Sequence, residues 1–287
     1  MMRAHVPRCI ALFSVGMLLT VGVCAQSAPQ PPKKKPPSQK AAAATPKLEL
    51  EPKAVEVLKA TSDRLSAAHT LEFSAVEMYE SLSRQSAPLA YTTKYEVALQ
   101  RPDKLRVFMP ADGPPSDFYY DGKHIMALAL KQDLLAVDDA PPTIEAALEK
   151  AFHLAAIYFP FTDLIVADPY AEAKGGLTHA YYVGQSNVIG GTTTNIVAYV
   201  NEGVFIQLWT GADDKLPRLV RAIFLDDPDE LRYEMAFSNW KLDEALSPDT
   251  FEPPNAATAK RIPFANPYLQ SPPGVQPLVK RKAAKKQ

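Results

Sequence analysis

The clearest indication of the fold is the stretch Tyr91-Thr92-Thr93-Lys94-Tyr95-Glu96-Val97-Ala98-Leu99-Gln100. Its odd-numbered positions hold Tyr, Thr, Tyr, Val and Leu, while most even-numbered positions are polar. This alternation is typical of a β-strand with one face on a core and one in water. Proline cannot donate to a strand ladder, so Arg101-Pro102-Asp103 interrupts the pattern, which resumes over residues 104–109. Asp121-Gly122 then predicts a hairpin between two apolar runs. Residues 91–130 are therefore predicted to form an antiparallel meander.

The flanking sequence predicts two helical regions and a second group of strands. A helix is expected over 51–68, with Val55, Leu58, Ser62 and Leu65 on its buried side. A second helix is expected to start at the N-cap Thr143, and short helical turns over 161–173 form a lid over the sheet. A loop containing Pro88 and a short strand at 133–137 are also predicted. Further strands are expected over 71–80, 178–187, 192–200, 204–210, 218–225 and 231–240. About ten or eleven strands favour a barrel or a strongly curved sheet.

The first 25 residues are typical of a secretory signal. Arg3 and Arg8 precede an apolar run of about 15 residues, shorter than the roughly 20 that a spanning helix needs. Cleavage is expected after Ala25, and an uncleaved anchor is the less favoured alternative. Lipidation at Cys24 is also less favoured, because Val23 occupies a position where a small residue is required. The expected location is the periplasm.

Composition divides the rest of the chain into a domain and two tails. Residues 26–47 and 265–287 are rich in proline and lysine and are expected to be a disordered linker and a disordered tail. Residues 48–264 are long enough for one domain with a sizeable core. They hold 19 of the 31 basic residues and all 32 acidic ones, so their formal charge is −13. The basic tails act either as solubilising tethers, the favoured interpretation, or as contacts to an anionic envelope surface.

Several short segments resemble those of a known family of periplasmic bacterial proteins. They occur in order along the domain and are residues 57–63, 101–106 and 118–123, Gln207-Leu208-Trp209, Leu216-Pro217-Arg218, Asn239-Trp240-Lys241-Leu242 and Phe251-Glu252-Pro253-Pro254. The family in turn resembles the LolA/LolB-type superfamily of lipoprotein and lipid carriers. The resemblance implies a LolA-like, mainly β (α+β) fold: an incomplete antiparallel barrel whose concave face is covered by helices, with an apolar cavity between. One departure is that the strand after Gly190-Gly191 lacks a histidine that the family often has, so no role of that residue carries over.

Motifs for chemistry were sought, and none gives a catalytic, metal or cofactor site. The sequence around Ser186 lacks the second glycine of a nucleophile elbow, and the histidines after residue 25 show no metal-binding spacing. The acidic run at 226–230 is better explained as a hairpin tip than as a calcium loop. No phosphate-binding glycine loop is present, and no nucleic-acid partner is expected.

The leading hypothesis is a non-enzymatic, monomeric periplasmic protein that binds a lipid acyl chain or a lipidated partner in an apolar cavity. The alternatives are an envelope interaction or sensor domain with a filled core, and a hydrolase whose site is assembled by folding. The expected cavity residues share an apolar character and inward-facing positions. They are Phe73, Tyr95, Val97, Leu105, Phe118, Tyr120, Leu148, Phe152, Tyr158, Trp209, Tyr233 and Phe237.

Overall fold

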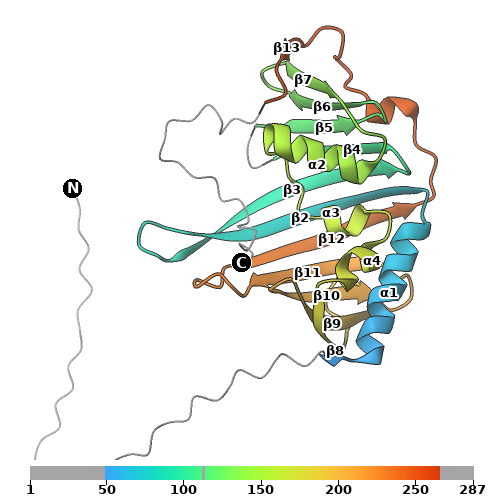
Figure 1. The fold of residues 1–287 in the computed structure, drawn as a ribbon, viewed down its shortest axis with the longest axis vertical. Coiled ribbons are helices and arrows are strands. Elements are labelled where there is room, and N and C mark those ends of the chain that lie inside the picture. The colour runs from blue at the N-terminus through green and yellow to red at the C-terminus, as the bar shows by residue number, and fades with distance from the viewer. Residues whose placement is uncertain (1–48, 112–113, 266–287) are drawn as a thin grey trace, which may run out of the picture. The chain divides into compact units, whose positions relative to one another are not determined.

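The computed structural model describes residues 49–111 and 114–265 and shows one open β-sheet with helices on one face (Figure 1). The sheet has thirteen strands in the order β1-β8-β9-β10-β11-β12-β2-β3-β4-β5-β6-β7-β13. Neighbouring strands are antiparallel except at the two edges, where β1 pairs with β8 and β13 pairs with β7 in parallel. The prediction of a mainly β fold, with an unclosed antiparallel sheet and helices on one face, is confirmed. The predicted signal, linker and tail lie outside the described residues, apart from Ala265.

The elements divide into strands that build the sheet and short helices that lie against it. The strands are β1 (Glu49–Leu50), β2 (Thr70–Leu82), β3 (Pro88–Gln100), β4 (Lys104–Met109), β5 (Ser116–Tyr120), β6 (His124–Ala129), β7 (Leu134–Asp139), β8 (Leu177–Ser186), β9 (Thr194–Asn201), β10 (Val204–Gly211), β11 (Pro217–Phe224), β12 (Arg232–Leu242) and β13 (Lys260–Ile262). The helices are α1 (Pro52–Ala67), α2 (Ile144–Ala155), α3 (Thr162–Ile165), α4 (Pro169–Lys174) and the 3₁₀ helix η1 (Pro248–Phe251).

The predicted meander is confirmed in register. In β3, Tyr95, Val97 and Leu99 are buried on one face; β3 pairs with β2 along its length and with β4 from Glu96 to Gln100. Tyr91, predicted on the same buried face, is 47 % exposed, because it lies in the part of β3 that extends beyond β4. The strand begins earlier than predicted, because Pro88, expected in a loop, is its first residue. A proline is tolerated there since its missing N–H interrupts no internal rung of the ladder. β2 and β3 consequently form a hairpin that projects beyond the neighbouring strands (Figure 1).

Three apolar clusters stabilise the sheet. The largest, the main core, lies between the helix-covered face of β2–β6 and β12, and α2 with the segment 157–165. A second cluster joins α1 to β8, β9 and β10. The third lies on the opposite face, where the alternation along β5 directs Tyr119 away from Phe118 and Tyr120 and against Ala259 of the C-terminal segment. Burial of these side chains is the main favourable contribution to folding.

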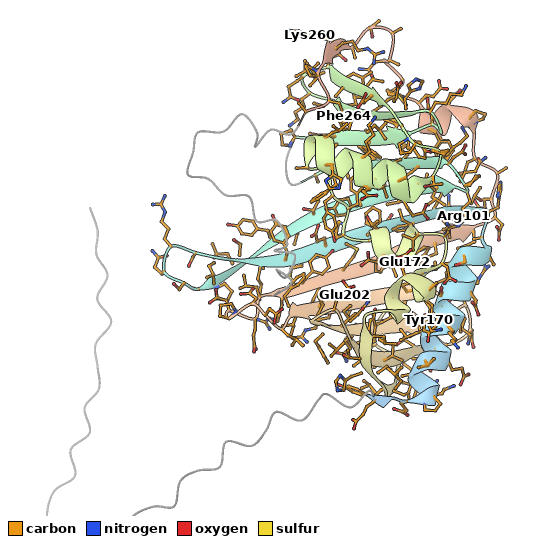
Figure 2. All side chains as sticks on the ribbon, viewed as in Figure 1. Arg101, Tyr170, Glu172, Glu202, Lys260 and Phe264 are labelled. Carbon is orange, nitrogen blue, oxygen red and sulfur yellow. The ribbon has the colours of Figure 1, made fainter. Side chains whose placement is uncertain are left out.

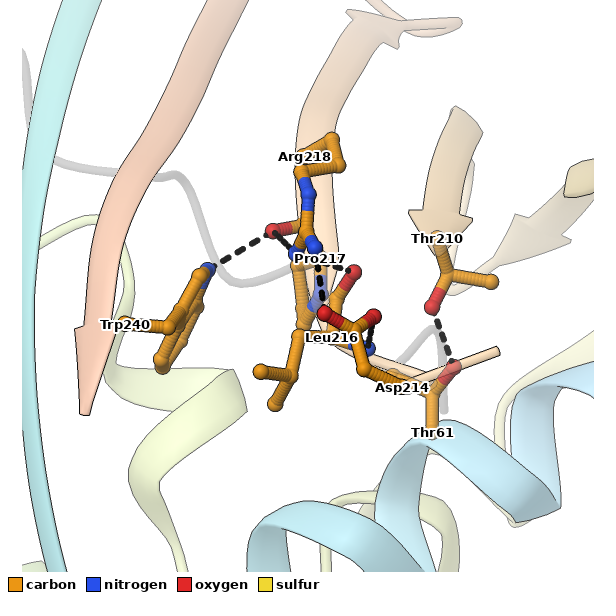
Figure 3. A network of polar contacts seen from close by, with 7 residues as sticks. All are labelled: Thr61, Thr210, Asp214, Leu216, Pro217, Arg218 and Trp240. Carbon is orange, nitrogen blue, oxygen red and sulfur yellow. Dashed lines mark hydrogen bonds and ion pairs between the residues drawn. The ribbon is translucent and has the colours of Figure 1, made fainter. Parts of the chain in front are cut away.

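The prediction for the buried side of α1 is right at Ser62 and Leu65 and wrong at Val55 and Leu58. Ala54, Val57, Thr61 and Leu65 are buried, whereas Val55 and Leu58 are only partly so. The difference arises because small residues allow the helix to approach the sheet closely, and because Thr61 bonds through its hydroxyl to Thr210 of β10 at 3.0 Å (Figure 3).

A polar network next to this contact fixes the turn between β10 and β11 (Figure 3). The guanidinium of Arg218 forms an ion pair with Asp214 and donates to the carbonyl of Leu216 at 3.1 Å. The indole N–H of Trp240 donates to the carbonyl of Pro217 at 2.9 Å. These bonds connect the turn at Leu216-Pro217-Arg218 to Trp240 of β12.

Candidate functional site

Nine of the twelve predicted cavity residues meet in the main core. Eight are buried and Tyr233 packs against them partly buried. The aromatic members make edge-to-face contacts, such as that between Tyr95 and Phe161 with ring centroids 5.4 Å apart. Edge-to-face rings at this spacing are packed against each other rather than separated by a void. The nine residues are Phe73, Tyr95, Val97, Leu105, Phe118, Tyr120, Leu148, Tyr233 and Phe237.

Trp209 does not share that face. Its neighbours along β10, Leu208 and Thr210, both face α1, through the second cluster and through the bond to Thr61. Side chains alternate along a strand, so Trp209 points to the other side of the sheet. The alternation along β10 thus places Leu208 and Thr210, rather than the predicted Trp209, on the helix-covered face.

The remaining predicted residues, Phe152 and Tyr158, open onto a cleft of about 230 Å³ beside α2. Leu148, a member of the main core, contributes to the same cleft. Sequence reasoning missed the other lining residues, which are Glu145, Glu149, Ile157, Phe159, Thr162 and Asp163. The cleft therefore lies where the main core reaches the surface, between one side of α2 and the chain that follows it.

The local sequence explains why the chain opens a cleft here. α2 begins at Thr143, whose hydroxyl accepts a hydrogen bond from the N–H of Ala146. It ends at Ala156, which adopts a left-handed conformation with φ of 56°. The next residues run in an irregular segment that buries Phe159 and Phe161 but leaves Tyr158 52 % exposed. A helix end followed by an aromatic-rich, non-helical segment leaves an apolar edge that no regular element covers.

A buried acid lies on the inward face of β2 near this cleft. Glu77 is 9 % exposed, and its carboxylate accepts a hydrogen bond of 2.6 Å from the hydroxyl of Tyr95. Burial raises the pKa of Glu77, and the bond from Tyr95 opposes this. The inward alternation of Phe73, Ala75 and Glu77 was the signal that could have identified Glu77 from the sequence.

The electrostatic influence of Glu77 reaches the edge of the cleft. Tyr158 is only partly buried; this partial burial and, secondarily, the charges of Asp163 and Glu77 raise its pKa. Burial and the charge of Glu77 likewise raise the pKa of Tyr233. All three phenolic groups, counting Tyr95, therefore remain neutral hydrogen-bonding groups at physiological pH. The cleft is apolar in its walls and electronegative in its surroundings.

The arrangement is suited to binding. Among residues 49–111 and 114–265, no group of three or more histidine, cysteine, aspartate or glutamate side chains is placed to hold a metal ion. The helices in the same part of the chain are all too short or too polar to cross a bilayer. What the site offers is an apolar recess with acidic groups around its mouth, which is the composition of a ligand pocket.

Fold and cleft together define the class: an open antiparallel sheet with an apolar cleft on its helix-covered face. The chain belongs to the family described as predicted periplasmic protein (DUF2092), whose model matches residues 54–265. The family resemblance drawn from the short segments is thereby confirmed. A comparison with curated proteins finds no match.

Solved structures give remote likenesses. MucB shares 12 % identity with a TM-score of 0.44, over 73 % of this chain and 65 % of that chain, so the match spans just under two thirds of MucB. LprF from Mycobacterium bovis shares 15 % identity with a TM-score of 0.41, over 69 % and 96 % of the two chains. The LolA superfamily protein NE2245 from Nitrosomonas europaea shares 8 % identity with a TM-score of 0.33, over 70 % and 97 %.

Proposed function

We propose that this protein is a non-enzymatic binding protein of the periplasm that holds an alkyl chain, from a lipid or a lipidated partner, in the cleft beside α2. The observation that supports it is the cleft itself, an apolar recess continuous with the main core. Leu148, Phe152, Ile157 and Phe159 would remove the chain from water, and this burial is the source of affinity. The periplasmic description of the family agrees with such a role.

The size of the cleft sets how much of a chain it admits. At ~30 Å³ for each non-hydrogen atom, the share of one water molecule in the liquid, 230 Å³ accommodates about eight atoms. The end of an acyl chain therefore fits without rearrangement. A whole long chain requires the irregular segment after α2 to move away from the sheet, which would make that segment the lid.

Calorimetric titration with dodecyl maltoside, below its micellar concentration, tests the proposal. Phe152 is half-buried on the cleft, so Phe152→Ala should weaken binding about fivefold, from ~1 kcal/mol of lost apolar contact. Phe108→Ala is the matched control. Phe108 is also half-buried, but it lies on the opposite face of the sheet, the face that carries Arg106 and Tyr119. Equal binding by both variants and the wild type would place the ligand elsewhere, and no binding at all would refute the proposal.

The packed main core favours a second candidate, an interaction domain that carries no ligand. Nine of the expected cavity residues belong to the main core, and Tyr95 and Phe118 pack edge to face against Phe161 and Phe159. Under this alternative a partner protein contacts the exposed surface, and Phe152→Ala changes partner capture no more than Phe108→Ala does. The titration above separates the two candidates, because only the first predicts saturable uptake of dodecyl maltoside.

A further inference from the structure

The charge around the cleft points to the chemistry of the ligand's polar end. We propose that the cleft selects an amphiphile whose alkyl chain ends in a cationic, ammonium-type group. The inference rests on the proposed function and adds the class of head group. It follows from three features: the charges that line the cleft, the cations nearby and their partners, and the aromatic face at the mouth.

Among residues 49–111 and 114–265, those that line the cleft include three carboxylates and no lysine or arginine. Glu145 and Glu149 lie on successive turns of α2, and Asp163 lies in the first turn of α3 on the other side. Glu145 is half-buried and accepts a hydrogen bond of 2.7 Å from the N–H of Ala167. Glu149 and Asp163 are exposed. A charged end emerging from the cleft therefore meets negative groups from two separate elements.

The cations near these carboxylates leave the charge incompletely balanced. Arg101, labelled in Figure 2, is close enough to Glu145 for their charges to interact, so it offsets one of the three negative charges. Its guanidinium donates to the backbone carbonyls of Leu65 and Val166. His153 lies 3.7 Å from Glu149, and this pair is ionic only when the imidazole is protonated.

Two further groups complete the electrostatic surroundings. Lys150, also on α2, is engaged by Asp138 at 3.2 Å. In the part of the chain that the structure describes, Asp163 has no ion-pair partner. The mouth of the cleft thus retains net negative charge.

Aromatic side chains at the mouth favour the same kind of group. Phe152 and Tyr158 both line the cleft, and Tyr158 is exposed enough for its ring to meet a ligand. An ammonium group is attracted to the face of an aromatic ring. A carboxylate or phosphate head would instead meet like charges, with no lysine or arginine among the lining residues to donate to it.

Three twelve-carbon amphiphiles that differ in head-group charge test the inference. Dodecyltrimethylammonium, dodecyl maltoside and dodecanoate are titrated below their micellar concentrations, at neutral pH and low salt. The wild type should bind the cation about tenfold more tightly than dodecanoate, because each exposed carboxylate contributes a few-fold. Added salt should reduce the ratio, since exposed charges are screened.

A charge-neutralised variant gives the decisive comparison. Glu149→Gln combined with Asp163→Asn should abolish most of the preference for the cation while leaving dodecyl maltoside binding within about twofold. Glu56→Gln combined with Asp213→Asn, two exposed carboxylates away from the cleft, is the control with the same change in net charge and should keep the preference.

The outcomes are distinct. Equal or tighter binding of dodecanoate by the wild type, or an unchanged preference in the Glu149 and Asp163 variant, overturns the selectivity and leaves the proposed function standing. Failure of all three amphiphiles to bind overturns both.

Discussion

Replacing Tyr95 by phenylalanine tests the most unusual interaction in the main core, the buried contact with Glu77. The variant keeps the ring, including its edge contacts with Phe159 and Phe161, and removes the hydroxyl that donates to the carboxylate at 2.6 Å. Within the described residues, no other donor to this carboxylate is found. A hydrogen bond to a charged group contributes about 1.5–3 kcal/mol, and a buried acceptor without a partner keeps its desolvation cost.

The expected loss is therefore about 2–3 kcal/mol at pH 7.5, or roughly 5–10 °C in Tm for a domain of this size. In urea the midpoint should fall by about 1 M. At pH 4 the loss should be smaller, because a protonated Glu77 carries its own donor and no charge. Urea unfolding followed by intrinsic fluorescence at both pH values measures this. Tyr91→Phe is the control and should stay within about 0.5 kcal/mol, because Tyr91 is exposed and its hydroxyl makes no hydrogen bond to another described residue.

Two results would refute this reasoning. A loss below about 0.5 kcal/mol for Tyr95→Phe would mean that water or another group satisfies Glu77 as well as Tyr95 does. An equal loss at both pH values would mean that the carboxylate charge plays no part. In either case the buried acid would not be a feature of the site.

Three further predictions concern stability. Because burial raises the pKa of Glu77 above its ordinary value of 4.5, wild-type stability should fall as pH rises from 4.5 through the folded pKa. Glu77→Gln should flatten that dependence and be more stable than wild type above it, as urea titrations across pH would show. Arg106→Met should lower the free energy of unfolding by about 3 kcal/mol in the same assay, because Asp117, whose side chain is 1 % exposed, loses its bidentate partner. A loss near zero would show that the hydroxyl of Tyr119 alone satisfies Asp117. Gly122→Ala should cost about 1–2 kcal/mol, since φ is +94° and a Cβ would lie 2.7 Å from a side-chain oxygen, whereas Gly175→Ala, in open space, should change stability by less than 0.5 kcal/mol; equal effects would contradict the strain argument.

The sequence predicted much of the sheet because its information is local. The alternation around Tyr95 and the turn at Asp121-Gly122 give β3 to β6 directly, and the short helical turns expected over 161–173 correspond to α3 and α4. The short edge strands β1 and β13 were not predicted. Two or three residues carry no periodicity, and their parallel pairing depends on where the rest of the chain places the sheet edges.

The site was predictable only in part, for a related reason. Alternation along the strands shows that Phe73 and Phe237 face inward, and the helical period shows the same for Leu148. It does not show where the inward side chains fill the space and where a recess remains. That depends on the end of α2 and on the path of the following segment around Tyr158, which are properties of packing.

Native mass spectrometry of the protein, purified from its own cell envelope without detergent, tests the central claim most directly. If the cleft beside α2 binds an alkyl chain, the protein should carry a reproducible added mass. Solvent extraction should remove this mass, and the extract should contain an alkyl-chain amphiphile. Phe152→Ala should lose much of it, and Phe108→Ala should retain it. A bare mass for the wild-type protein, together with no uptake of dodecyl maltoside, would contradict the account and leave the interaction-domain candidate in its place.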